Sequence, residues 1–240
     1  MLKETKKFHN RTKLEKVLDD VGGEIPIEYV HTFYKTYPRL PYVTLPSVDR
    51  SDSYFETLLE ARQSSRNFSD TPMTLEEVSM IMGSCRITRH AQNFEGRTYP
   101  SGGARFPIEL YLFAFNVAGL DQGAYHYNIR DSTLEVLLKR NIKERQRELI
   151  SPYLENPAAT IVFTSVISRS EVKYGYKAYP LSLIEAGHMG QNIHLACAEI
   201  CVGSCSVSGF VNDTTSELLD LSPDEIPIYT ISMGKRRALI

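Results

Sequence analysis

The chain has 240 residues, of which 42% are hydrophobic and 23% charged, and its formal net charge is -2. This composition is typical of a globular protein, and the near-neutral charge offers no broad field for nucleic acid. No uncharged apolar run reaches the ~18 residues needed to span a bilayer, and the polar N-terminal stretch lacks the apolar part of a signal peptide. We therefore expect a cytoplasmic protein with reduced thiols that binds neither nucleic acid nor membrane.

The first 48 residues differ in character from the rest. A short charged helix is predicted within residues 12–21, and residues 22–46 are rich in tyrosine and proline. Because proline fixes its own backbone and extends the residue before it, this stretch should lie extended along a surface. We divide the chain into an N-terminal extension, residues 1–48, and one domain, residues 49–240.

The domain begins with two helices whose first turns carry capping boxes. The boxes are Ser53–Glu56 and Thr74–Glu77, in which a hydroxyl and a carboxyl each satisfy a free backbone N–H. The spacing of apolar residues predicts that Phe55, Leu58 and Leu59 of the first helix point inward.

The remaining elements mix helices and strands without a strict alternation. A loop is predicted over 86–106 and a mostly exposed helix over 139–149. Residues 181–201 are apolar on almost every side, which predicts a helix in the core. Buried strands are predicted over 108–117 and 159–167, a shorter strand over 124–128 and the last strand over 226–234. This pattern favours an α+β fold over a doubly wound sheet.

Two short basic clusters are candidates for binding an anion. In ARQSSRNF, Arg62, Ser64 and Arg66 alternate, so an extended backbone places them on one face. Such a face suits a phosphate, although a solvated turn is the simpler interpretation of this stretch alone. The second cluster, residues 235–237, follows the last strand, and the two clusters could meet on one dianion.

A third candidate is the pair Lys173 and Tyr174 in KYGYKAY. A nearby ammonium lowers the pKa of a tyrosine, which can make the phenol a general acid or base. A tyrosine-rich packing loop is an equally good interpretation of the spacing.

The histidines and cysteines near the long helix are not predicted to bind metal. His188 and His194 are six residues apart and do not share a helical face, so we expect both to be buried with hydrogen-bond partners. Three cysteines are spaced four apart, but Gly203 should end the helix before the third, and no fourth ligand is evident. They are Cys197, Cys201 and Cys205.

The stretch YPSGGARFP, residues 99–107, has two adjacent glycines between two prolines. A serine–glycine loop before an ordered element can bind phosphate, and glycine also lets a backbone approach a flat molecule closely. For Arg105 the simplest expectation is a salt bridge with Glu109.

These stretches resemble, in order, the signatures of FMN-dependent nitroreductases and, among them, of SagB-type dehydrogenases. RQSSRNF resembles R-x-S-x-R-x-F, PSGGARFPIELY resembles P-S-G-G-A-R-Y-P-x-E-x-Y, and GAYHYN resembles G-x-Y-x-Y-D. KYGYKAYPLSLIEAGHMGQNIHLA, GSCSVSGFVN and EIPIYTISMGKRR continue the match, which covers residues 50 to 240. The resemblance implies an α+β nitroreductase-like fold with a central mixed β-sheet flanked by helices. It also implies an intertwined homodimer with FMN at the interface.

The resemblance further implies which residues would form the site. The FMN phosphate and neighbouring groups would contact Arg62, Gln63, Ser64, Arg66, Lys235 and Arg237. Pro100, Ser101 and Gly102 would lie against the isoalloxazine ring, and Ser208 and Gly209 near its reactive edge. Lys173 and Tyr174 match a pair that helps deprotonate an azoline ring in SagB-type enzymes. The chain departs from the family at Gln63, where a basic residue is common, at Ser208, where glutamate is common, and at Pro180, where the subgroup commonly has arginine.

The implied activity is a ping-pong flavin cycle between a nicotinamide or organic donor and an acceptor, which is a small molecule or a peptide. Three alternatives stay open: an azoline dehydrogenase acting on thiazolines or oxazolines, a non-catalytic flavin-binding protein, and a structural subunit of a larger complex. The tyrosine-rich first 48 residues suggest the last of these.

Overall fold

A six-stranded sheet forms the centre of the molecule. The computed structural model describes residues 3–16, 34–91 and 94–237, and its sheet has the strand order β7-β6-β4-β8-β10-β9. The strands are β4 (Ile108–Ala114), β6 (Gly123–Asn128), β7 (Thr133–Lys139), β8 (Ala159–Val166), β9 (Val202–Val207) and β10 (Glu225–Lys235).

Every neighbouring pair in this sheet is antiparallel, so the mixed sheet expected from the sequence is corrected to an antiparallel one over the described residues. The cause is the position of β10. Strands β8 and β9 run in the same direction and are joined through helices, but β10 lies between them and pairs with both. As the last strand of the order, β9 has a free edge within the sheet.

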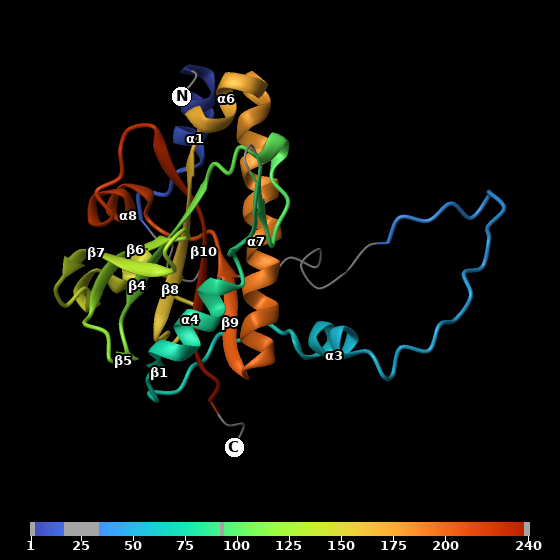
Figure 1. Ribbon diagram of the computed structural model, residues 1–240, viewed down its shortest axis with the longest axis horizontal. Helices are drawn as coiled ribbons and strands as arrows, with labels where there is room; N and C mark the ends of the chain where they lie inside the picture. Colours follow the sequence, from blue (N-terminus) through green and yellow to red (C-terminus); the bar gives the residue numbers. More distant parts are fainter. Residues whose placement is uncertain (1–2, 17–33, 92–93, 238–240) are drawn as a thin grey trace, which may run out of the picture.

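Helices cover both faces of the sheet, which confirms the α+β class (Figure 1). On one face, α4 (Leu75–Gly83) and the long α7 (Ala178–Glu199) contribute to the main hydrophobic cluster. On the other, α5 (Gln146–Leu149) and α8 (Asn212–Leu218) contribute to a second cluster. The core therefore consists of two apolar layers separated by the sheet.

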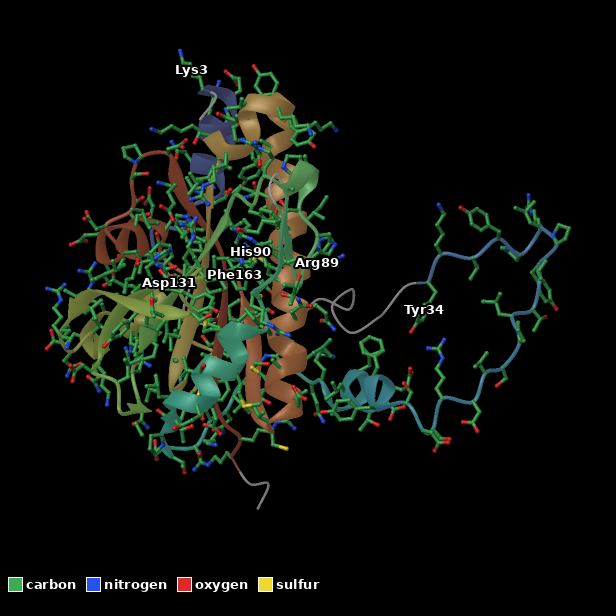
Figure 2. The ribbon with its side chains drawn as sticks, viewed as in Figure 1. Lys3, Tyr34, Arg89, His90, Asp131 and Phe163 are labelled. Atoms are coloured by element: carbon green, nitrogen blue, oxygen red, sulfur yellow. The ribbon has the colours of Figure 1, made fainter. Side chains whose placement is uncertain are left out.

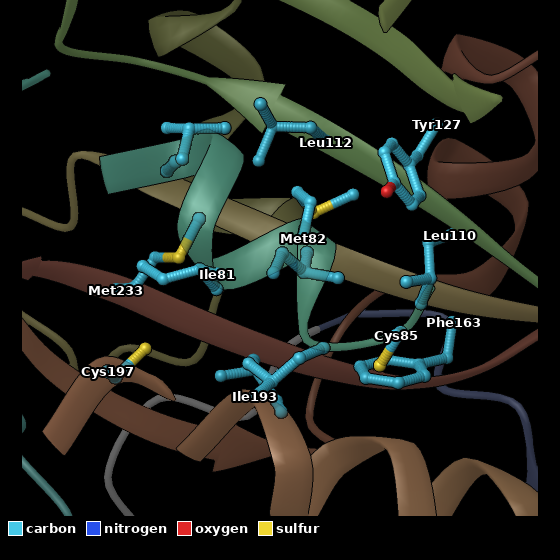
Figure 3. Close-up of a cluster of buried hydrophobic side chains, with 14 of the residues drawn as sticks. Ile81, Met82, Cys85, Leu110, Leu112, Tyr127, Phe163, Ile193, Cys197 and Met233 are labelled. Atoms are coloured by element: carbon cyan, nitrogen blue, oxygen red, sulfur yellow. The ribbon is translucent and has the colours of Figure 1, made fainter. Parts of the chain in front are cut away.

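Strand β4 shows why this part of the sequence is apolar without a break. Leu110 and Leu112 belong to the first cluster, whereas Tyr111 and Phe113 belong to the second. Alternate residues of a strand point to opposite faces, and here both faces are covered. Burying each such side chain contributes about 1.5–3 kcal/mol. Figure 3 shows side chains of α4, α7 and the sheet meeting in the first cluster.

Smaller elements fill the connections. They are α1 (Lys3–Thr12), α3 (Tyr54–Ala61), β1 (Met73–Thr74), β2 (Ile87–Ala91), β3 (Phe94–Arg97), η1 (Gly102–Ala104), β5 (Val117–Ala118), η2 (Lys143–Arg145), α6 (Ser168–Tyr174) and η3 (Gly175–Lys177). The predicted loop 86–106 contains the β2–β3 hairpin. The helix predicted over 139–149 is reduced to η2 and α5, because Lys139 still pairs in β7.

Both predicted helix starts have their caps. At α4, Thr74 and Glu77 form the full reciprocal box, and at α3 the Ser53 side chain accepts from the Glu56 N–H. The inward orientation of Phe55 is wrong, since this side chain is 59% exposed. The reason is that α3 lies against the end of α7 on one side alone, where Leu58 and Leu59 are half-buried, and Phe55 is on the uncovered side.

The N-terminal region splits into two described parts. Helix α1 ends at Thr12, where the predicted helix was to begin, and residues 17–21 of that prediction lie outside the described residues. Residues 34–53 form an exposed arm in which Tyr34 and Tyr42 are 82% and 89% exposed. Figure 2 shows Tyr34 on this arm, well away from Phe163 in the core. Among the described helices, none is long and apolar enough to cross a membrane.

Candidate functional site

The two basic clusters lie side by side. The Ser69 N–H donates to the Lys235 carbonyl at 2.9 Å, and Phe68 and Arg236 form an antiparallel bridge. Arg237 Nη1 lies 3.5 Å from Asn67 Oδ1. Two segments more than 160 residues apart in sequence are thus joined by backbone contacts. We call residues 61–69 together with 235–237 the clamp region.

The cations of the clamp region differ in their partners. Lys235 forms an ion pair with Glu77, the same carboxyl that completes the α4 capping box. By contrast, four arginines have no carboxylate partner among the described residues: Arg62, Arg66, Arg236 and Arg237. Guanidiniums gathered without a counter-ion form a suitable binding site for a phosphate.

The clamp region runs along the free edge of β9. Ser64 forms a parallel bridge with Ser204, and the Ser65 N–H donates to the Ser204 carbonyl at 2.9 Å. The close approach depends on Gly203, where a Cβ atom would lie 2.9 Å from Ser65 Cβ. This stretch is therefore extended, which is the condition under which Arg62, Ser64 and Arg66 would share one face. Gly203 does not end the helix as predicted. It lies in β9, and Cys201, with a φ of 58°, makes the left-handed turn after α7.

A hydrogen-bonded chain follows the same edge. His194 on α7 contacts Ser204 Oγ through Nδ1 at 2.7 Å and Ser206 Oγ through Nε2 at 2.6 Å. The Tyr229 hydroxyl donates to the same Ser206 oxygen. Burial, and then the nearby charge of Arg62, lower the pKa of His194 to about 4, so the ring is neutral at pH 7. The sequence predicted a buried, partnered His194 correctly but not this chain of hydroxyls.

His188 behaves differently. It is exposed on the outer side of α7, so the prediction that it is buried is wrong, because that side of the helix has no covering element among the described residues. Cys197 and Cys205 are buried and Cys201 is exposed. Within the described ranges, no group of histidine, cysteine or acidic residues could hold a metal ion.

Ser208 and Gly209 follow β9 directly and line a cavity of about 420 Å³, together with Tyr179 and Leu183 of α7. Leu183 and His194 are eleven residues apart on α7, which places them about 20° apart around the helix axis. Ser208, the hydrogen-bonded chain and the clamp region therefore all lie along one side of the molecule.

The loop of residues 99–107 packs against the pair Lys173 and Tyr174. Gly103 has a φ of 61°, and a Cβ atom there would collide with Tyr174 Oη and lie 2.8 Å from Lys173 Nζ. Gly102 is different, because its Cβ would meet Leu181 Cδ1 at 3.4 Å, an ordinary contact. Gly103 is thus the glycine that the fold itself requires. Gly102 stays free for contact with another molecule.

Lys173 and Tyr174 end helix α6, with Lys173 Nζ 5.3 Å from the Tyr174 ring centroid. The ammonium lies over the face of the aromatic ring, and the polar ends of both side chains border the Gly103 backbone. The sequence predicted the pair but not its contact with Gly103.

A buried carboxyl supports this loop from α7. Glu185 is only 2% exposed. Burial raises its pKa to about 7, against hydrogen bonds from Ser101 and the Ile108 N–H and the charge of Arg97, which lower it. Its Oε1 has no hydrogen-bond partner among the described residues. This group was missed in the sequence, although the EAGH stretch contains it.

The expected salt bridge between Arg105 and Glu109 is not formed. Glu109 pairs instead with Arg169 at 2.5 Å and with His126 at 3.2 Å, while Arg105 Nε donates to the Arg169 carbonyl at 2.7 Å. The reason is that α6 places Arg169 between the two residues.

The two groups of predicted site residues lie apart. The loop 99–107 meets α7 at Leu181, whereas the clamp region approaches it near His194. These helix positions are thirteen residues apart, which corresponds to about 20 Å along the axis and about 140° around it.

Comparison with known proteins identifies the family. The family model described as "Nitroreductase family" matches residues 59–235. A putative nitroreductase of Methanocaldococcus jannaschii is 24% identical over 196 residues, which cover 81% of this chain and 96% of that protein. The microcin B17-processing protein McbC of Escherichia coli is 30% identical over 132 residues, covering 52% of this chain and 48% of McbC. The match therefore spans about half the length of McbC. The trifolitoxin-processing protein TfxB of Rhizobium leguminosarum is 25% identical over 134 residues, which cover 53% of this chain and 36% of TfxB, and both relatives support the SagB-type resemblance.

Solved structures share the fold. One chain of the E. coli microcin synthetase McbBCD complex with truncated pro-MccB17 bound has a TM-score of 0.77 at 20% identity, and the match covers 99% of this chain and 95% of that one. A putative nitroreductase from Ralstonia eutropha has a TM-score of 0.67 at 22% identity over 82% of this chain and 90% of that one. On the family match over most of its length, this chain belongs to the nitroreductase family of flavin-dependent oxidoreductases.

Proposed function

We propose that this flavin-dependent oxidoreductase uses FMN, and that two copies of the chain build each FMN site. The observation behind the proposal is the clamp region, where four arginines without carboxylate partners among the described residues lie beside the outer edge of β9. FMN differs from riboflavin by a phosphate, and a site for that group is what this cluster of guanidiniums suits.

One chain would hold the phosphate and the reactive edge of the ring. Arg62, Ser64, Arg66, Lys235 and Arg237 would surround the phosphate, with Gln63 beside them. Lys235 would contribute with its charge already balanced by Glu77. The ring would extend along β9 toward Ser208 and Gly209, which lie on the same side of α7 as the clamp region.

The second copy would supply the loop against the ring. The loop with Pro100, Ser101 and Gly102 meets α7 about 140° around the helix axis from the clamp region, which favours a site built from two chains. Exposed apolar residues supply surface for that contact. Leu183 and Ile184 on α7 are 42% and 55% exposed, and such patches mark interfaces. Residues 34–48 of the exposed arm belong to the proposed N-terminal extension, and they would pack against other chains in the assembly.

Bound FMN would supply the hydride chemistry. The protein would bind and orient the flavin and the substrate, and would transfer protons to or from the substrate. The neutral His194 and the Ser206 hydroxyl would hold the β9 edge in one arrangement beside the flavin. Lys173 and Tyr174, held against Gly103, would take or give a proton on the substrate. The nicotinamide donor NAD(P)H and an organic acceptor would complete a ping-pong cycle.

A second candidate is an azoline dehydrogenase acting on a peptide. Two observations favour it: Lys173 and Tyr174 lie together beside a glycine loop, and two relatives are named as processing proteins, one of microcin B17 and one of trifolitoxin. In this case a partner that presents the peptide is expected.

The purified protein tests the proposal. We expect it to be yellow or to take up FMN, to elute as a dimer, and to lose its flavin absorbance when NADH or NADPH is added without oxygen. Protein that takes up no FMN would refute the proposed function. Protein that binds FMN but is reduced by no donor, thiazolines included, would show a flavin-binding protein without turnover.

A further inference from the structure

We propose that the cavity between α1, the first half of α7 and the residues after β9 binds a neutral, planar ring of the substrate, and that His9 is its hydrogen-bonding residue. The cavity has a volume of about 420 Å³, which lies within the range for small-molecule sites. Figure 1 shows α1 beside α6 at the end of the molecule where α7 begins.

Helix α1 is fixed to the residues that follow β9. Lys13 Nζ pairs with Asp213 Oδ1 at 2.7 Å, the Leu14 N–H donates to Asn212 Oδ1 at 3.4 Å, and Leu14 and Val211 form a parallel bridge. One wall of the cavity and the segment containing Ser208 and Gly209 are therefore held as a unit. A wall anchored in this way can define the shape of a ligand.

His9 is the observation that indicates a ligand. Its side chain lines the cavity and the residue is only 3% exposed. Nδ1 lies 3.4 Å from Tyr179 Oη, while Nε2 is buried without a hydrogen-bond partner among the described residues. A buried polar atom without a partner destabilises a fold, so it is retained where something else supplies the partner.

The lining determines the chemical class of the ligand. The cavity is lined by aromatic, aliphatic and uncharged polar side chains. Burial, and then the charge of Lys13, lower the pKa of His9 to about 4, so this ring is neutral at pH 7 as well. Phe8 and Tyr179 pack edge to face with ring centroids 5.8 Å apart. An ionised ligand would be left without a counter-charge, whereas a flat uncharged ring could pack against the aromatic wall.

The role of this cavity in catalysis rests on the proposed function, in which FMN binds beside Ser208 and Gly209. Ser208 and Gly209 line this cavity and are also the residues assigned to the reactive edge of FMN. A ring bound here would lie next to that edge, so α1 would select which uncharged rings reach the flavin. Binding itself needs no flavin and can be tested separately.

Calorimetric titration of the full-length protein, with and without FMN, tests the inference with naphthalene-2-carboxamide as the probe. We expect binding in both forms, at least tenfold weaker binding of 2-naphthoate, and at least tenfold weaker binding of the amide to His9→Phe. His90→Phe, which changes an exposed histidine of β2, is the matched control and should bind as wild type does. Equal affinities for amide and carboxylate, or for wild type and His9→Phe, would overturn the inference, as would no binding of the amide.

A second variant covers the case in which His9→Phe does not fold. Tyr179→Phe removes only the hydroxyl beside His9 Nδ1 and should weaken amide binding about threefold with an unchanged melting temperature. An unchanged affinity in Tyr179→Phe would contradict the inference. If FMN binds but the amide does not, the cavity inference fails and the proposed function stands. If the amide binds but FMN does not, the proposed function fails and the cavity inference stands.

Discussion

The clamp region and the loop of residues 99–107 differ in which of their groups already have partners within the chain. In the clamp region, distant segments are joined by their backbones, while the side chains of Arg62, Arg66 and Arg237 have no carboxylate partners among the described residues. In the loop, the backbone packs against its own chain, and Gly103 touches Lys173 and Tyr174. The clamp region can bind an anionic ligand, whereas the loop holds the side chains of Lys173 and Tyr174 in place. The two lie on different sides of α7, so the proposed site would join them only across two copies.

Removing two of the arginines without carboxylate partners should have the largest effect, which is on the affinity for FMN. Arg62→Gln with Arg66→Gln should weaken FMN binding about 10³-fold, because each charge-assisted hydrogen bond to a phosphate contributes ~1.5–3 kcal/mol. Flavin fluorescence titration measures the loss. Arg140→Gln, a change of an exposed arginine elsewhere, should leave the affinity unchanged.

The same double variant can show whether the site spans two chains. Mixed and refolded with Gly102→Val, which damages only the loop, it should regain FMN binding at about one quarter of all sites, because random pairing makes half of the dimers mixed and each mixed dimer has one intact site. No recovery would mean that the clamp region and the loop serve the same chain.

Changing the pair beside the loop should affect catalysis and not FMN binding. Tyr174→Phe should slow reduction of FMN by 2-phenylthiazoline-4-carboxamide about 10²-fold, the usual contribution of one general acid or base. Stopped-flow absorbance measures the rate. Tyr176→Phe, a 65% exposed neighbour, serves as the control. A full rate in Tyr174→Phe would remove the phenol from the proposed mechanism.

The buried carboxyl behind the loop should give a pH-dependent stability. The pKa of Glu185 is raised to about 7, so the folded chain keeps a proton that the unfolded chain releases near pH 4.5. Stability should therefore fall as pH rises from about 4.5 to 7, by on the order of 2–3 kcal/mol. Urea unfolding of Glu185→Gln should lack this fall. Comparing the two proteins removes the opposite contributions of His9 and His194, and parallel pH profiles would contradict the assignment.

The smallest expected effect is a difference in the free energy of unfolding between substitutions of Gly103 and Gly102. Gly103→Ala should cost about 1–2 kcal/mol, because its φ of 61° strains any residue with a side chain. Gly102→Ala, whose Cβ meets only an ordinary contact with Leu181, should cost less than about 0.5 kcal/mol. Thermal unfolding distinguishes them, and equal costs would mean that the loop is not packed as described.

The sequence predicted local features well. Both helix starts, the long helix and most of the strands are present, because capping residues and apolar runs act over a few residues. One side of the long helix is exposed, however, at Leu183, Ile184 and His188. The interest of Arg62, Ser64 and Arg66 depended on an extended backbone, and the bridge of Ser64 to Ser204 supplies it. The site roles of these residues stay predictions.

Long-range features could not be predicted from the sequence. Nothing local indicates that β10 inserts between β8 and β9, that Glu77 pairs with Lys235, or that Arg169 takes the place of Arg105 beside Glu109. The burial of His9 and Glu185 could not be predicted either, because the elements that cover them are far away in sequence. The exposure of Phe55 was not predicted, because the spacing of apolar residues identifies the apolar face of a helix but not the element that covers this face.

The attachment of α1 has a consequence for how the molecule forms. Lys13 and its partner Asp213 are 200 residues apart, so α1 leaves the ribosome long before the residues on which it docks. At ~5–20 residues per second, this delay is on the order of 10–40 s. The cavity at His9 is therefore completed only after β9 and α8 have been synthesised, and a nascent chain has no such cavity before that point.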